Sequence, residues 1–406
     1  MTGQLPGSPG QVAQQADDFG WDGHPLEPGI ALALSGGGFR AMLFHAGALV
    51  RLNELGVLSK VARISSVSGG SIAAGQLACV WNQLGRANAA GVFARFQETY
   101  VEPLLAFSRE KIGIGDIVHG LLPWTSAAQQ VAATFDRSLF GDKTLQDLPD
   151  TPRFVFCATN MQTGVLFRFS KSYAGDYLIG RLVAPTLPLS TAVAASTAFP
   201  PFFSPLLLAL PEDSFTGWSD DAAGHLDAAP YRDRIHLADG GVYDNLGLEP
   251  VVKRYMAILA SDGGAPFGRS ADMGTDPIRQ LQRVFDVTGN QVRALRRRDL
   301  IARYQAAAKA GLQPDAVDPY ARLGAYWGID TDPANVAPAG ALPCGATTVT
   351  KLANLASGMS DLGDTPSRQL VNWGYAICDR CVRVHYGAIL QQSPAPKWPC
   401  PEQPLG

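Results

Sequence analysis

Long apolar runs, an excess of charge and a leader-like start are all missing from this chain of 406 residues. No stretch of eighteen apolar residues exists, so the sequence predicts no membrane-spanning helix. The formal net charge is only −3, which excludes a general attraction to nucleic acid or to an anionic membrane surface. Residues 1–28 have neither a basic start nor an apolar segment, and we interpret them as a flexible N-terminal segment.

Cysteine is also scarce, which argues against a disulfide scaffold and for a reduced, cytoplasmic protein. Two of the six cysteines, Cys79 and Cys157, fall in apolar segments and are expected to be buried thiols. Cys378 and Cys381 have the spacing of a redox or zinc pair, but no second pair or histidine cluster accompanies them. We therefore expect no metal site and no cofactor, unless the two remaining cysteines converge on this pair.

The overall composition is that of a globular protein with a sizeable core. Hydrophobic residues make up 46% of the chain and charged residues 17%, which is too apolar for a disordered protein. We find no internal repeat and no clear linker. The sequence therefore predicts one elaborated domain, with a core over residues 29–264 and a helical and loop extension over 265–406 packed on that core.

Two consecutive strand–helix units open the fold. The apolar run 30–34 is followed by a helical pattern from about residue 40 to 55, and the run 61–67 is followed by a second pattern over 69–84. Consecutive units of this kind indicate a parallel sheet covered by helices, which makes the predicted fold class α/β.

The remaining segments alternate between strand and helix patterns. A Gly-containing turn between alternating apolar runs predicts a hairpin of strands 153–159 and 165–169. The C-terminal part predicts one or two helices over 276–310 and a final helix over about 367–385. The short apolar stretch 112–124 is either a helix packed on the core, which we favour, or a lid over a lipid site.

The first glycine-rich turn, Ser35 to Arg40, offers bare N–H groups at the start of a helix, where negative charge is stabilised. The string from Gly36 to Ala41 also matches the dinucleotide fingerprint G-x-G-x-x-A. The second strand, however, ends in serines and lacks the acidic residue that would bind a ribose. A cradle for an oxyanion therefore fits better, and Arg40 either holds the loop, meets a substrate phosphate or lies on the surface.

The second turn presents Ser68 between an apolar strand and an Ala-rich helix, which is the setting of a nucleophile elbow. Ser66 stands where the G-x-S-x-G pattern has its first glycine, and Gly70 stands at the last. A serine nucleophile beside an oxyanion cradle is the minimum equipment for acyl transfer.

A base must take the proton of this serine, and no histidine of the chain is well placed to do so. His45 falls inside the first predicted helix at core spacing, and His236 falls inside a strand. Asp239 and Asp262 each end a strand and precede two glycines, the position where α/β sheets carry functional loops. From the residues alone, Asp239 has only a modest lead over Asp262.

In these motifs the chain resembles the patatin-like phospholipases. The resemblance rests on three strings in the order found in that family: Ser35-Gly36-Gly37-Gly38-Phe39-Arg40, Ser66-Val67-Ser68-Gly69-Gly70 and Asp239-Gly240-Gly241. Two further stretches, 158–164 and 195–203, agree with the hairpin of the family and with its Ala/Ser-then-Pro-aromatic segment. Together the five motifs span roughly residues 29–260.

This resemblance implies a three-layer α/β/α fold with a mostly parallel central sheet, and hydrolysis of fatty-acyl esters without a metal. It implies that Ser68 and Asp239 form a catalytic dyad. It further implies that the N–H groups of Gly37 and Gly38 form the oxyanion hole. The implied supporting residues are Gly36, Arg40, Gly70, Gly240 and Gly241.

The function predicted from the sequence is that of a serine hydrolase acting on phospholipid or another acyl-ester lipid, with peripheral contact at a membrane surface. Two alternatives come from other classes: a nucleotide-binding oxidoreductase that uses the glycine turn, and a non-catalytic lipid-sensing module on the same fold. A further basic face on the helix at 276–310 is formed by Arg293, Arg296 and Arg297. We interpret it as a solvated face, and attraction of anionic headgroups is the alternative.

Overall fold

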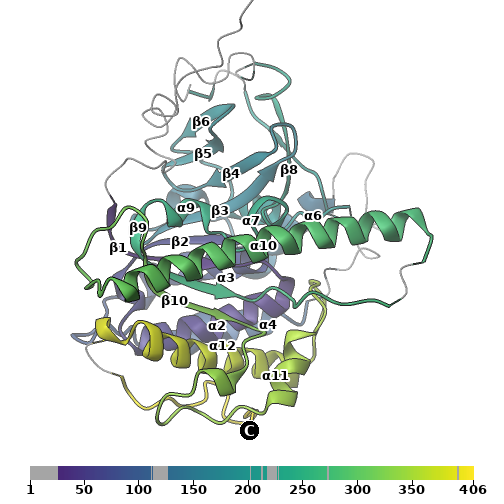
Figure 1. Cartoon of the computed structure of the whole chain (residues 1–406). Coiled ribbons are helices and arrows are strands. Elements are labelled where there is room, and N and C mark those ends of the chain that lie inside the picture. Colours follow the sequence, from purple (N-terminus) through teal and green to yellow (C-terminus); the bar gives the residue numbers. More distant parts are fainter. Residues whose placement is uncertain are drawn as a thin grey trace, which may run out of the picture.

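The computed structural model describes residues 26–110, 112, 127–201, 203–211, 214–216, 226, 228–271, 274–390 and 393–406. Within these residues, ten strands form one sheet in the order β10-β9-β1-β2-β3-β4-β5-β6, with β8 also beside β3 and β7 beside β8. Helices cover the parallel part of this sheet (Figure 1). The predicted α/β fold with a mostly parallel central sheet, flanking helices and a helical C-terminal region is confirmed.

The sheet has a parallel part and an antiparallel part. Strands β10, β9, β1, β2 and β3 run parallel, whereas β4, β5 and β6 continue from β3 as an antiparallel meander. The strand bounds are β1 Glu27–Leu34, β2 Val61–Val67, β3 Arg153–Asn160, β4 Val165–Phe169, β5 Tyr173–Asp176, β6 Gly180–Val183, β7 Leu206–Ala209, β8 Arg234–Asp239, β9 Tyr255–Asp262 and β10 Leu323–Gly328.

An α-helix follows each of the first two strands, and α-helices dominate the last third of the chain. Their bounds are α2 Gly38–Glu54, α3 Gly69–Val80, α4 Glu102–Phe107, α6 Ala127–Phe135, α7 Leu189–Ser196, α8 Gly241–Asp244, α9 Glu249–Val252, α10 Pro277–Lys309, α11 Ala346–Ala353 and α12 Asp364–His385. The long helix expected at 276–310 is the single helix α10, and α11 is an element that the sequence pattern did not indicate.

Alternation along β1 explains the layers. Leu32 and Leu34 are fully buried in the cluster that contains α2, α3 and α12, whereas Ala31 and Ala33 are buried in a second cluster against α9 and α10. Side chains of a strand point alternately to the two faces of its sheet, so both faces of β1 are covered. Figure 1 shows α10 crossing one side of the sheet while α2 and α12 lie together on the other.

Helices α2 and α12 approach each other unusually closely. A Cβ on Gly47 would overlap the carbonyl oxygen of Val371, and a Cβ on Gly374 would overlap that of Phe44. Each glycine therefore lets the backbone of the other helix pack directly against it. This contact ties the C-terminal extension to the helix that follows the first glycine turn.

We expect Gly47→Ala to lower the free energy of unfolding by about 3 kcal/mol or more, because the added methyl group would force two buried backbones apart. Gly289→Ala is a matched control in the middle of α10, where a Cβ meets nothing within 4 Å. That substitution should stabilise the protein by about 0.5–1 kcal/mol through helix propensity. Urea unfolding of both variants checks the prediction, and equal effects would contradict the close packing.

Some segments singled out in the sequence lie outside the described residues. These include residues 1–25 of the N-terminal segment and residues 113–124 of the apolar stretch 112–124, on which the choice between a packed helix and a lid depends. Ile112 itself is buried, and its N–H donates to the carbonyl of Met359 at 3.0 Å.

Candidate active site

The carboxyl ends of strands β2 and β8 meet on the same edge of β3. Strand β2 runs parallel to β3 and pairs with it as far as Val67 opposite Cys157. Strand β8 runs antiparallel and pairs Asp239 with the next residue of β3, Ala158, while β4 occupies the other edge. Because Ser68 follows β2 directly, this head-on arrangement places Ser68 beside Asp239.

Ser68 lies at a sharp turn between β2 and α3. Its backbone has φ 51° and ψ −122°, a positive-φ conformation that costs a non-glycine residue about 1–3 kcal/mol. The Ser68 N–H donates to the hydroxyl of Ser196 at 2.9 Å. Its neighbours Val67 and Gly69 are buried, whereas Ser68 remains partly exposed. The strand–turn–helix geometry is that of a nucleophile elbow.

The two residues that flank Ser68 at a distance of two positions fit the elbow in different ways. Ser66, in place of the more usual glycine, is fully buried; its hydroxyl donates to the Val155 carbonyl and accepts from Ser71 at 3.0 Å. Gly70 donates its N–H to the Ser35 carbonyl at 3.1 Å, and a Cβ there would lie 2.6 Å from the same oxygen. The hydroxyl of Ser66 is therefore satisfied by hydrogen bonds, whereas the close approach of backbone at Gly70 leaves no room for a side chain.

Asp239 is buried at the end of β8, with 3% of its surface exposed. Its Oδ1 accepts the N–H of Gly241 at 2.7 Å, and its backbone carbonyl accepts the Thr159 hydroxyl at 2.8 Å. Burial raises the pKa of Asp239 to about 6, although hydrogen bonds from Gly241 and from the Ser68 hydroxyl oppose the shift. The carboxylate thus faces the serine and binds a proton more tightly than an ordinary aspartate.

The first glycine turn packs directly on the elbow. A Cβ on Gly36 would lie 3.1 Å from that of Ser68, and a Cβ on Gly69 would overlap the carbonyl of Gly38. The φ values of Gly37 and Gly38 are 143° and 63°, which only glycine adopts without strain. Both residues lie at the N-terminus of α2, where N–H groups have no partner within the helix.

The turn is also fixed on both sides by backbone hydrogen bonds. The Gly36 N–H donates to the Asn245 carbonyl, and the Phe39 N–H donates to the Gly358 carbonyl, each at 3.0 Å. The Asp239-Gly240-Gly241 turn also lies next to the elbow, since a Cβ on Gly240 would lie 3.2 Å from the Val67 side chain. There a Cβ on Gly240 would overlap the Cys157 carbonyl. Glycine is therefore required at both turns by close approach of neighbouring backbone.

Arg40 and His45 are both fully buried beneath the glycine turn, so the interpretation of Arg40 as a surface residue is wrong. Arg40 donates to the carbonyl oxygens of Gly263 and Leu355. The His45 Nε2 lies 2.9 Å from the Ser35 carbonyl, which can only accept, so Nε2 carries the proton. Burial lowers the pKa of His45 to about 4. His45 is a neutral packed residue, as its helical spacing indicated.

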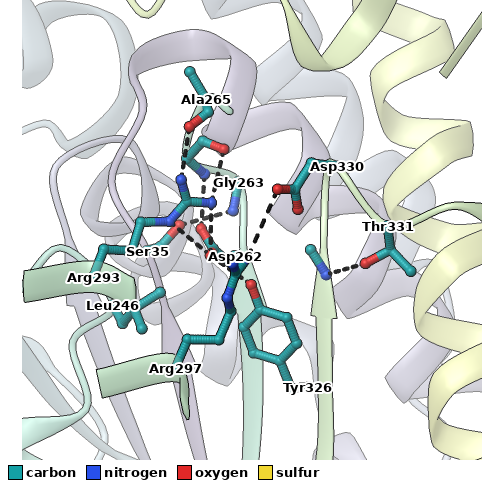
Figure 2. Close-up of polar contacts among 12 residues, drawn as sticks. Ser35, Leu246, Asp262, Gly263, Ala265, Arg293, Arg297, Tyr326, Asp330 and Thr331 are labelled. Carbon is teal, nitrogen blue, oxygen red and sulfur yellow. Dashed lines mark hydrogen bonds and ion pairs between the residues drawn. The ribbon is translucent and has the colours of Figure 1, made fainter. Parts of the chain in front are cut away.

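Asp262, the rival of Asp239, is held by an ion pair (Figure 2). Its carboxylate accepts from Arg293 Nε at 2.9 Å and from the Tyr326 hydroxyl at 2.7 Å. Burial alone would raise the pKa of Asp262, but the charge of Arg293 together with hydrogen bonds from Tyr326, Arg293 and the Gly264 N–H outweighs that effect, and the pKa lies below its ordinary value. This carboxylate is therefore committed to a structural contact with α10.

The predicted solvated face of α10 is wrong for two of its arginines. Arg293 is only 8% exposed and pairs with Asp262, and Arg296 donates to Glu249 at 2.8 Å. Arg297, which is more exposed, lies 3.7 Å from Asp330. The arginines share a helix face because that face carries ion pairs to turns of the core.

Two residues of the site were given no role of their own from the sequence. Ser196, on the buried helix α7, accepts the Ser68 N–H and donates to the Cys157 carbonyl at 2.6 Å. Asn245 places its amide oxygen where a Cβ on Gly36 or Gly241 would collide with it. The available signal for Ser196 was a polar residue at the C-terminal end of an Ala-rich helix. Asn245 follows Asp239 by six residues and offered no periodic pattern.

The cysteine expectations can be stated for the described part of the chain. All six cysteines are free thiols, and Cys157 and the Cys378/Cys381 pair are buried, whereas Cys79 is half-buried. No group of three or more potential metal ligands occurs among the described residues. A search of the same residues finds no helix with the length and apolar character needed to cross a membrane.

Comparison with known proteins gives a family match and several similar solved structures. A family model described as patatin-like phospholipase matches residues 32–252, more than half of the chain. The search of curated proteins finds no match. Among solved structures, the chain is similar to human GIVD cytosolic phospholipase A2, with a TM-score of 0.46 and 16% identity. That match covers 94% of this chain and 62% of the human chain, so this chain spans less than two thirds of the length of that protein.

Two further solved structures complete the comparison. The human enzyme in complex with methyl gamma-linolenyl fluorophosphonate inhibitor and terbium chloride gives a TM-score of 0.48 at 15% identity, covering 94% of this chain and 62% of that chain. VipD from Legionella pneumophila gives a TM-score of 0.37 at 13% identity, covering 89% and 68%. On the match of the family model, which includes both glycine turns, the elbow and Asp239, this chain belongs to the patatin-like phospholipase family.

Proposed function

We propose that this chain hydrolyses acyl esters of lipids, with Ser68 as the nucleophile and Asp239 as its general base. One observation carries the proposal: strands β2 and β8 end at the same edge of β3, which places Ser68, on a strained turn, beside the buried Asp239, whose pKa is raised to about 6. A serine hydroxyl attacks only if a base removes its proton, and a carboxylate with a raised pKa is a stronger base than an ordinary aspartate. Family membership supports a lipid ester as the substrate.

The N–H groups of Gly37 and Gly38 are the proposed oxyanion hole. They lie at the positive end of the α2 dipole and next to the elbow, since the backbone of Gly38 contacts Gly69. Donors aimed at the developing oxyanion contribute about 10²- to 10³-fold each to the rate. The hydrogen bonds of Gly36 and Phe39 to other carbonyls hold the two donors between them in place.

The reaction then follows from these positions. Ser68 Oγ attacks the ester carbonyl carbon while its proton passes to Asp239, and the carbonyl oxygen becomes an oxyanion bound by the glycine N–H groups. The protonated Asp239 gives this proton to the leaving alkoxide, and an acyl-enzyme remains. Asp239 next takes a proton from water, which attacks the acyl-enzyme, and the fatty acid leaves as Ser68 regains its proton.

Aromatic residues beside the dyad support an acyl chain as the ligand. The Asp239 N–H donates to the carbonyl of Ala198, so the segment that begins with Phe199 lies next to the dyad. Phe199 is 45% exposed and its ring packs edge-on against that of Phe285 on α10. Phe203, four residues on, is half-buried. We infer that this segment borders the acyl site, and that the enzyme meets phospholipid or another acyl-ester lipid at a membrane surface.

A fluorophosphonate carrying a long alkyl chain tests the proposal directly. It should label one residue, Ser68, as identified by mass spectrometry of the digested protein, and labelling should abolish hydrolysis of a short-chain p-nitrophenyl ester and of phosphatidylcholine vesicles. Labelling should fail in Ser68→Ala. Absence of labelling and hydrolysis in the folded wild type would refute the proposal and favour a non-catalytic lipid-binding module.

A further inference from the structure

The glycine turn is joined to a part of the chain that the family match does not include. That match ends at residue 252, whereas Gly263 and the segment 355–359 lie beyond it. The Phe39 N–H donates to the Gly358 carbonyl, and a Cβ on Gly38 would overlap that same oxygen. The segment 355–359 therefore packs against the backbone that carries the proposed oxyanion donors.

Arg40 makes the second connection. Its Nε and one terminal nitrogen lie 3.3 and 3.2 Å from the Gly263 carbonyl, and its other terminal nitrogen donates to the Leu355 carbonyl. The side chain has no exposed surface. Burial and the nearby Arg293 lower the pKa of Arg40 to about 10, so the guanidinium is still charged at neutral pH. All three of its nitrogens are thus directed at backbone carbonyls.

The Gly263 carbonyl is itself fixed from outside the matched region. The Gly263 N–H donates to the Ser35 hydroxyl at 2.8 Å, so Gly263 contacts the glycine turn through both its N–H and its carbonyl. Arg293, on α10, spans the turn around it through Asp262 and through the carbonyls of Gly264 and Ala265, as Figure 2 shows for Asp262 and Ala265. Helix α10 therefore holds one of the two anchors of Arg40.

We propose that Arg40 is a positioning residue: it fixes the Gly36–Gly38 turn by joining α2 to the Gly263 and Leu355 carbonyls, so that the C-terminal extension is part of the active site. This inference rests on the proposed function. It gives Arg40 no contact with substrate, because the guanidinium faces buried carbonyls and has no exposed surface. Only a planar fork spans two separate carbonyls, and lysine carries a single ammonium.

The test compares Arg40→Lys with Arg322→Lys. Arg322 is a matched control because it is 1% exposed and donates to backbone carbonyls, including that of Val252 at 2.9 Å. It precedes β10 and lies at the opposite end of the parallel strands from the site. Both variants should lower the melting temperature, but only Arg40→Lys should lower kcat, on the order of 10²-fold, with KM little changed.

Two substrates separate positioning from headgroup binding. The loss in kcat for Arg40→Lys should be the same on a neutral p-nitrophenyl ester as on phosphatidylcholine, because the defect lies in the oxyanion donors. An unchanged kcat on the neutral ester, with a raised KM on the phospholipid alone, would overturn the proposal. An equal loss of kcat in Arg322→Lys would also overturn it, since the effect would then be one of general stability.

Amide hydrogen exchange provides a readout that does not depend on hydrolysis. Peptides covering residues 35–41 and 355–359 should exchange faster in Arg40→Lys than in wild type, and at the wild-type rate in Arg322→Lys. If the wild-type chain hydrolyses no ester, the proposed function fails. Faster exchange confined to these peptides in Arg40→Lys would still support the role of Arg40 in fixing the turn. Unchanged exchange in Arg40→Lys would show that Arg40 does not hold the turn.

Discussion

Ser68→Ala should remove ester hydrolysis by a factor on the order of 10⁴ or more while the protein stays folded. The variant lacks the hydroxyl oxygen that we propose as the nucleophile, whereas the buried core around the elbow is unchanged. Initial rates on a p-nitrophenyl ester and on phospholipid vesicles, with circular dichroism as the check on folding, measure the effect. Full activity in the folded variant would contradict the assignment of the nucleophile.

The turn offers a second, independent readout of the same residue. At φ 51° alanine keeps the strain of the elbow, but glycine does not. Ser68→Gly should therefore be as inactive as Ser68→Ala, yet more stable by about 1 kcal/mol. Inactivity combined with this gain would show that the strain serves to present the hydroxyl. If Ser68→Gly were the less stable of the two variants, the strain argument would be wrong.

Asp239→Asn should lower activity about 10²- to 10⁴-fold and, at pH 8, raise the free energy of unfolding by about 2–3 kcal/mol. The native pKa of about 6 lies above the ordinary value of 3.8, so the ionised carboxylate destabilises the folded state. The sign follows from linkage: the unfolded chain releases this proton first, and stability falls as pH rises from about 4 to 6. The gain should therefore vanish near pH 4.

Asp262→Asn is the matched control, because both aspartates end a strand and precede two glycines. Asp262 pairs with Arg293, so its neutralisation leaves a buried cation unpaired and should cost about 3–5 kcal/mol at pH 8. The same chemical change should thus have opposite signs at the two sites. Equal destabilisation by both variants would mean that Asp239 is only a structural acceptor.

In the wild type, kcat/KM should fall tenfold per pH unit below about 6, because protonated Asp239 cannot act as the base.

The early part of the chain could be predicted because each strand there is a compact apolar run that stops at a glycine turn. The predicted strands at 30–34 and 61–67 correspond to β1 and β2, and the helices after them to α2 and α3. These are local patterns, set by residues that are neighbours in sequence. The candidate nucleophile Ser68 stands at such a turn, whereas the oxyanion role of Gly37 and Gly38 was implied by the family resemblance.

What local pattern could not supply was the choice between two chemically identical turns. Asp239 and Asp262 differ because β8 meets β2 head-on along β3, whereas Asp262 faces Arg293 of α10. Both facts depend on pairings between distant segments. The arginines of α10 show the same limit: their shared face is visible in the sequence, but the carboxylates that neutralise it are not adjacent to it.

The glycine-mediated crossing of α2 and α12 has a consequence for how the chain is made. Helix α2 ends at Glu54, whereas α12 begins only at Asp364. Some three hundred further residues must therefore be synthesised before α12 can cover α2. At about 5–20 residues per second, synthesis of that interval takes roughly 15–60 seconds. Contacts of such large sequence separation also slow folding itself. During translation, the face of α2 that α12 covers is therefore without its partner helix until α12 emerges.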